Sequence, residues 1–190
     1  MDRQATWELL TEYTKNESLV KHALAVEAAM RAYAGKFGED PEVWGIVGLI
    51  HDFDYERYPS AEAGHPFKGA EELRAKGYPE FVVKAVLSHA EYSGVPRETP
   101  MEKTLFACDE LCGFITAAAL VRPTKSVLDL EASSVRKRMK DKAFARQVRR
   151  EDIIHGAEQL GVELNEHITL VIKAMRGIAD ELGLRGSIEN

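Results

Sequence analysis

The sequence predicts an all-α protein, and three observations support this fold class. Glycine and proline fall at the edges of long segments whose apolar residues recur with helical spacing. We find no Val/Ile/Thr-rich alternating run of the kind that strands require. The chain has 190 residues, of which 45% are hydrophobic and 29% charged, so it is long enough to bury a core. We therefore expect one compact helical unit.

The individual helices follow from their start and stop signals. Thr6 can cap a short first helix, and the glycines at 35 and 38 should end the next one. Asp40-Pro41 combines a capping carboxylate with proline at the first helical position. In this half we expect a short helix after Thr6, helices over 17–34, 41–51, 65–76 and 79–91, and a loop over 53–64.

The most apolar helix is expected over 101–121, because the residue before Pro123 avoids helical geometry. Beyond it the composition becomes more charged, with short helices expected over 134–149 and 151–160 and a long amphipathic helix over 165–182. We predict a metal-binding helical core over 1–121 and a C-terminal helical extension over 122–190 that packs on the same domain.

Charge and the N-terminal segment limit the classes of partner. The formal net charge of −6 argues against a general nucleic-acid binder. Residues 122–150 nevertheless hold ten Lys or Arg against three Asp or Glu. This segment either is a solvated helix face, which we favour, or faces an anionic substrate. No signal peptide or membrane span is evident, so we expect a cytoplasmic protein.

Several polar residues fall on helix faces that ought to be apolar. Asp109 shares its face with apolar neighbours in the most hydrophobic helix, where an unpaired carboxylate would cost several kcal/mol. His22, His51 and His89 lie on the inward faces of three other helices. Each histidine alone is expected to be a hydrogen-bonded core residue, but the set is hard to satisfy except around a shared cation.

The ligand types indicate which metals are suitable. Imidazoles and carboxylates suit zinc, iron, manganese, cobalt or nickel, and we expect one or two such divalent ions. Cys108 and Cys112 lack the partners of a thiolate site and are interpreted as packing residues. For His51 and Asp52 to reach one metal, their helix should end there, because adjacent helical residues point about 100° apart.

These residues resemble the HD superfamily of metal-dependent phosphohydrolases over roughly residues 18–119, which implies an HD-domain-like helical bundle. The family pattern of a histidine, a His-Asp pair and a distant aspartate matches His22, His51-Asp52 and Asp109. Its longer, two-metal form adds two histidines, here His65 and His89. By this resemblance His22, His51, Asp52 and Asp109 bind the first ion, whereas Asp52, His65 and His89 bind the second.

The resemblance implies hydrolysis of a phosphate ester or nucleotide-like substrate by a metal-activated water. Besides Asp52, we consider Asp54 for orienting the water and Lys68 or Arg97 for holding phosphate, with a plain surface role as the favoured alternative for these three. If only one ion binds, His65 can instead act as a general acid. The GYP signature of cyclic-dinucleotide phosphodiesterases and the Glu-Asp pair of alarmone hydrolases are absent, which disfavours those substrates.

Two other functions remain open from the sequence. A di-iron oxygenase similar to inositol oxygenase would use the same ligand set, and a binding or signalling module would use the metal for structure alone. A small phosphorylated molecule or nucleotide is the expected partner of the hydrolase, and the sequence makes no prediction of oligomeric state.

Overall fold

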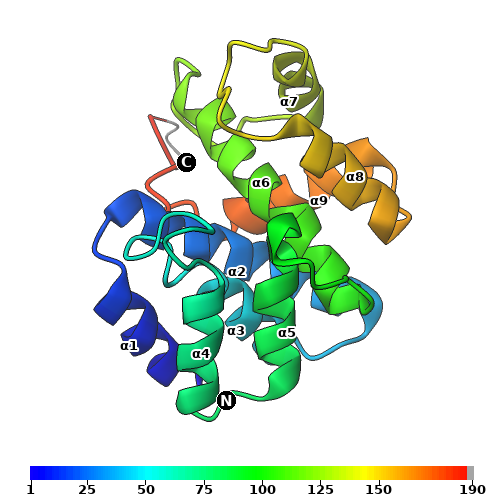
Figure 1. Cartoon of the computed structure of the whole chain (residues 1–190). Coiled ribbons are helices and arrows are strands. Elements are labelled where there is room, and N and C mark those ends of the chain that lie inside the picture. Colours follow the sequence, from blue (N-terminus) through cyan, green and yellow to red (C-terminus); the bar gives the residue numbers. More distant parts are fainter. Residues whose placement is uncertain (188–190) are drawn as a thin grey trace.

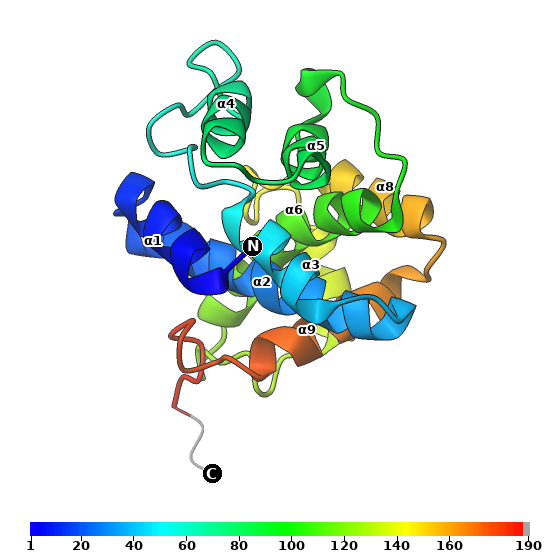
Figure 2. The same ribbon diagram turned by 90° about the horizontal axis from the view of Figure 1, so that it is seen from below.

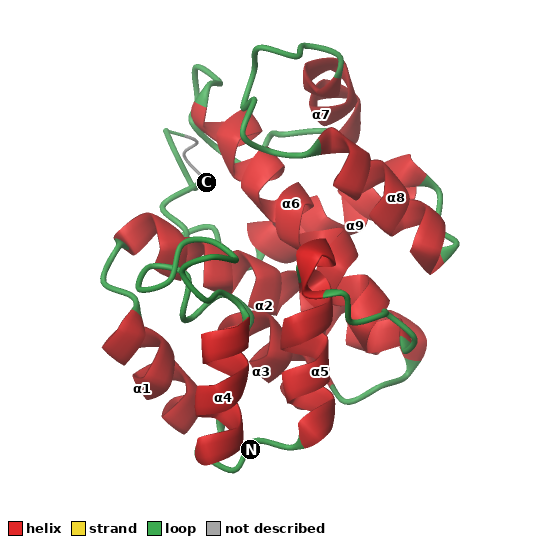
Figure 3. Ribbon diagram, viewed as in Figure 1, coloured by secondary structure: helices red, strands yellow, loops and turns green. Residues whose placement is uncertain are grey.

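Helices account for all the regular structure in residues 1–187, the part of the chain that this computed structural model describes (Figure 3). The predicted all-α class is therefore confirmed. None of the described helices is long and apolar enough to cross a bilayer. The helices are α1 (Arg3–Tyr13), α2 (Glu17–Phe37), α3 (Pro41–Ile50), α4 (Phe67–Ala75), α5 (Glu80–His89), the 3₁₀ turn η1 (Glu91–Ser93), α6 (Pro100–Leu120), α7 (Ala132–Met139), α8 (Arg150–Leu160) and α9 (Leu164–Arg176).

Every helix except α1 begins within two residues of the expected position. The Asp40 carboxylate caps α3 by accepting from the backbone N–H of Glu42, as predicted. At α1 the cap is Asp2 and not Thr6, whose hydroxyl instead donates to the Asp2 carbonyl from inside the helix. At α6 a capping box between Thr99 and Glu102 moves the first residue to Pro100.

Two predicted C-terminal helices are shorter than expected. The first, expected over 134–149, ends at Met139, because the Asp141 carboxylate accepts from the next backbone N–H groups and forms a turn. The turns that follow are held by Arg150, whose guanidinium donates to the carbonyls of Ala145 and Val148. The last helix, expected to reach 182, ends at Arg176 and continues as turns.

Helices α2 and α6 form the centre of the bundle, and most other helices pack on one of them. In Figure 1, α7 lies at the end of α6 that is farthest from α4 and α5. Figure 2 shows α9 on the side of α2 opposite to α4 and α5. Buried residues of α8 and α9 belong to the same apolar cluster as those of α2 to α6. The boundary predicted at residue 121 stays a prediction, and residues 188–190 of the predicted extension lie outside the described residues.

Helix α8 approaches α6 closely at Gly156. A Cβ atom at this glycine would lie 2.5 Å from the Ala107 Cα and 2.8 Å from its Cβ, distances that real side chains do not reach. The absence of a side chain therefore brings the two backbones together. Because Ala107 precedes Asp109 by two residues, α8 is placed beside the part of α6 that bears the predicted metal ligand.

Candidate metal centre

The predicted ligands converge in two neighbouring groups at the centre of the bundle. They come from α2, the end of α3, the loop before α4, the end of α5 and the middle of α6. In each group, one potential ligand atom per residue lies within 4.8 Å of all the others. The first group is His22, His51, Asp52 and Asp109, and the second is Asp52, His65 and His89.

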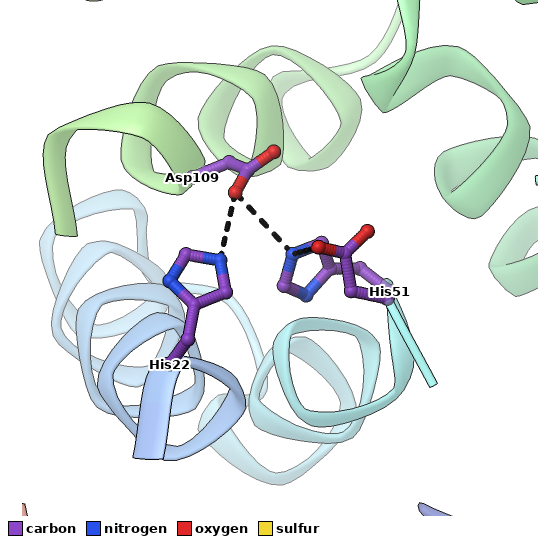
Figure 4. A group of neighbouring side chains, drawn as sticks. His22, His51 and Asp109 are labelled. Atoms are coloured by element: carbon purple, nitrogen blue, oxygen red, sulfur yellow. Dashed lines mark hydrogen bonds and ion pairs between the residues drawn. The ribbon is translucent and has the colours of Figure 1, made fainter. Parts of the chain in front are cut away.

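The first group is centred on the Asp109 carboxylate. Its Oδ1 lies 2.9 Å from His22 Nε2 and 3.4 Å from His51 Nε2. Figure 4 shows the two rings approaching this carboxylate from α2 and from the end of α3. Metal bonds of about 2.1 Å at tetrahedral or octahedral angles place neighbouring ligand atoms about 3.0–3.5 Å apart. The observed distances therefore suit a shared divalent cation.

The second group shares the Asp52 carboxylate with the first. Asp52 Oδ1 lies 3.3 Å from His65 Nε2 and 3.2 Å from His89 Nε2. Its other oxygen, Oδ2, lies 3.5 Å from His51 Nε2 in the first group. Each oxygen of this carboxylate thus faces a different group, so Asp52 could contribute one oxygen to each of two ions.

Two histidines present an available nitrogen because the other ring nitrogen is bonded to their own helix. His51 Nδ1 lies 2.7 Å from the Gly48 carbonyl, and His89 Nδ1 is bonded to the Val86 carbonyl. A carbonyl can only accept, so Nδ1 carries a proton, and in the neutral ring Nε2 keeps its lone pair for a metal. The buried His51 Nε2 has no hydrogen-bond partner, as expected of an atom that ligates a metal.

The helix end at His51 agrees with the sequence prediction. Helix α3 finishes at Ile50, and His51 is its C-terminal cap residue. Turns follow it, and His51 and Asp52 both contribute a potential ligand atom to the first group.

The electrostatics of the group explain how two carboxylates are tolerated there. Burial lowers the pKa of His51, but Asp52 and Asp109 outweigh this effect and raise it to about 9. Burial by itself raises the pKa of Asp109, whereas His51 and the hydrogen bond from His22 hold this pKa well below its ordinary value. Asp109 therefore stays ionised and requires a positive partner, whether an imidazolium or a metal ion.

A pocket of about 360 Å³ opens above the two groups. Its walls combine aromatic and charged side chains from the turns after α3, from η1, from α6 and from the start of α8, which sequence reasoning did not single out. Arg149 is the one lysine or arginine among the described residues that line it. These newly found wall residues include Tyr55, Glu91, Tyr92, Phe106, Glu110, Arg149 and Asp152.

Two of the wall residues have shifted acidities. Burial raises the pKa of Glu110 to about 7, and the neighbouring Asp109 charge adds to this. Burial also raises the pKa of Tyr92 to about 12, so its hydroxyl keeps its proton and can donate a hydrogen bond. For Arg149 the only sequence signal was its place in the basic segment, because its position depends on the long-range approach of α8 to α6.

The three auxiliary residues considered from the sequence do not line this pocket. Asp54 is fully buried behind His65, so it does not face a metal-bound water. Lys68 is half exposed and pairs with Glu71 at 2.8 Å. The guanidinium of Arg97 lies 3.7 Å from the centre of the Phe106 ring, which lines the pocket, but Arg97 itself does not line it. The structure thus places these residues outside the lining of the pocket, and their roles stay predictions.

The two cysteines take no part in either ligand group. Cys108 and Cys112 are buried free thiols in the apolar cluster, as predicted. Burial raises the pKa of both, which keeps them protonated and poor as metal ligands.

Comparison with protein families yields one match. The family model described as HD domain matches residues 19–113, half of the chain. This segment contains both ligand groups. No curated protein and no solved structure matches the chain.

Proposed function

The chain belongs to the HD-domain family, and from this premise we propose that it is a metal-dependent phosphohydrolase acting on a small phosphate ester or nucleotide. The observation that supports this most directly is the pair of ligand groups joined by Asp52 at the floor of a pocket. Metal-dependent hydrolysis is typical of this family, and divalent metals are the ions for which the imidazole and carboxylate donors are suited.

Divalent ions in these groups would supply an activated water and offset the negative charge of the phosphoryl oxygens. The chain supplies the geometry. His22, His51 and Asp109 would hold one ion, His65 and His89 would hold the other, and Asp52 would contribute to both positions. Because His51 and His89 are oriented by bonds within their own helices, their Nε2 atoms need little reorganisation on metal binding.

The pocket supports a small substrate. A volume of about 360 Å³ is in the range of small-molecule sites. Arg149 lines the pocket and pairs with Asp152 at 3.2 Å, and we assign to it the phosphate contact that the sequence suggested for Lys68 or Arg97. Glu91, Glu110 and Asp152 line the same pocket and disfavour ligands that carry several phosphates.

The test is phosphate release by protein loaded with manganese, iron or zinc, with metal content measured on the same sample. The panel comprises p-nitrophenyl phosphate, nucleoside mono-, di- and triphosphates, cyclic nucleotides and sugar phosphates. We expect metal-dependent release, strongest with monophosphates, and its loss in Asp52→Asn and His51→Gln. The control is His155→Gln, which removes an exposed imidazole outside both ligand groups.

Two results would contradict the proposal. One is a folded protein with both metal positions filled that releases phosphate from no member of the panel. The other is substrate-dependent oxygen uptake by the iron-loaded protein, which would favour the oxygenase instead.

A further inference from the structure

His65 differs from His89, the other histidine of the second group, in how its ring is held. His89 lies on a helix and is oriented by a backbone carbonyl of that helix. His65 lies in the turns before α4, where no helical carbonyl is available to it. Its Nδ1 lies instead 2.7 Å from Oδ1 of Asp54, a side chain eleven residues away. The Nδ1 side of this ring is therefore held by a side-chain carboxylate and not by a helix.

Asp54 is itself held firmly. Its side chain is fully buried, and its second oxygen accepts from the backbone N–H of Gly69 at 2.8 Å. Gly69 is in the first turn of α4, whose N-cap residue Pro66 provides no side-chain cap. A Cβ at Gly69 would lie 2.8 Å from the Asp54 carboxyl carbon, so this glycine leaves room for the carboxylate. The first turn of α4 thus fixes Asp54, and Asp54 fixes His65.

The direction of the bond determines which nitrogen of His65 is available. An ionised carboxylate only accepts, so His65 Nδ1 donates and Nε2 keeps a lone pair. That Nε2 lies 3.3 Å from the shared carboxylate of Asp52. A carboxylate behind a ligating histidine also increases the basicity of the ring, and removal of such a partner typically weakens metal affinity 10–100-fold.

We propose that Asp54 is a positioning residue that makes His65 a ligand and thereby controls occupation of the second metal position, without contacting metal or substrate itself. The first group should be affected little, because no member of it is bonded to Asp54. The proposal concerns metal binding and stands or falls independently of the substrate.

The test compares Asp54→Asn with wild type by calorimetric titration of the metal-free protein with Mn²⁺ and by native mass spectrometry. His65 and Gly69 are bonded to different oxygens of Asp54, and an amide replaces one of these oxygens with an NH2 donor, so one bond is lost or the ring is forced into the other tautomer. We expect wild type to bind two ions. In Asp54→Asn the second dissociation constant should rise 10–100-fold while the first changes less than about threefold.

A spectroscopic readout separates positioning from simple stabilisation of α4. With two equivalents of Mn²⁺, wild type should give the exchange-coupled electron paramagnetic resonance signal of a dinuclear site, whereas Asp54→Asn should give the six-line signal of isolated Mn²⁺. The matched control is Glu56→Gln, in the same segment, whose carboxylate accepts two backbone N–H groups but contacts no ligand. It should bind two ions as wild type does.

Gly69→Ala provides a second variant should Asp54→Asn fail to fold. This variant retains the Asp54 carboxylate, but the added Cβ displaces it from its position. We expect it to weaken the second position selectively. Tight binding of two coupled ions in folded Asp54→Asn, or in Gly69→Ala if only that variant folds, would overturn the proposal. Equal weakening of both positions would also overturn it.

Discussion

The buried histidine of α9 should make the stability of the protein depend on pH. His167 is fully buried, its Nδ1 lies 2.5 Å from the Tyr33 hydroxyl, and its Nε2 lies 2.9 Å from the Ala107 carbonyl. The carbonyl requires a proton on Nε2, which leaves Nδ1 to accept from Tyr33 in the neutral ring. Burial lowers the pKa of His167 to about 4, against about 6.5 in an unfolded chain.

The sign and size of the effect follow from proton linkage. Between pH 6.5 and 4 the unfolded chain binds a proton that the folded chain does not, so this contribution is complete above pH 6.5 and is lost as the pH falls. A difference of about 2.5 pKa units, at 1.36 kcal/mol each, corresponds to about 3 kcal/mol at pH 4. That is a large part of the stability of an ordinary domain.

The assay is urea denaturation of the metal-free protein between pH 4 and 7.5, for wild type and His167→Gln. The metal-ligand histidines titrate in both proteins, so the difference between the two free energies of unfolding isolates His167. Wild type should lose about 3 kcal/mol relative to the variant as the pH falls from 7 to 4. The control is the exposed His155→Gln. A difference that stays constant with pH, or a control that changes as much as His167→Gln, would refute the reasoning.

Three further outcomes are expected. Arg149→Gln should raise KM for a monophosphate substrate about tenfold with little change in kcat, because it removes the guanidinium that lines the pocket. Gly156→Ala should reduce the free energy of unfolding by about 1–3 kcal/mol, since its Cβ would overlap Ala107, whereas Gly35→Ala, with nothing within 4 Å, should increase it by up to about 1 kcal/mol. When the free metal concentration is 100 times the dissociation constant, chelation should lower the free energy of unfolding of wild type by about 2.7 kcal/mol per ion. The decrease should be smaller in His51→Gln, and urea denaturation measures both.

The sequence was informative where local chemistry decides the structure. Asp40-Pro41 is a helix start in almost any context, because the carboxylate and the fixed proline φ act within one turn. The region around Asp141 was predicted wrongly because its composition is compatible with a helix. There, bonds from the side chain to the backbone compete with helical ones, and Arg150 then holds the resulting turns.

The same distinction applies to the metal centre. His22 and Asp109 could be singled out because each is polar on an apolar helix face, which periodicity reveals. The place of Asp54 could not be predicted, because its burial and its bond to His65 depend on how the turns before α4 fold back. The pocket wall at Arg149 likewise depends on the contact between α8 and α6, which no local pattern encodes.

The packing of α8 and α9 around Ala107 limits how far the protein can be shortened. The carbonyl of Ala107 accepts from His167 of α9, and the same residue receives Gly156 of α8, two positions before Asp109. A fragment trimmed to the family-matched residues 19–113 would therefore expose to solvent the face of α6 that packs against α8 and α9. The Ala107 carbonyl would also lose its hydrogen-bond donor, His167. Such a fragment is expected to aggregate on expression, so deletion studies should keep the chain through α9.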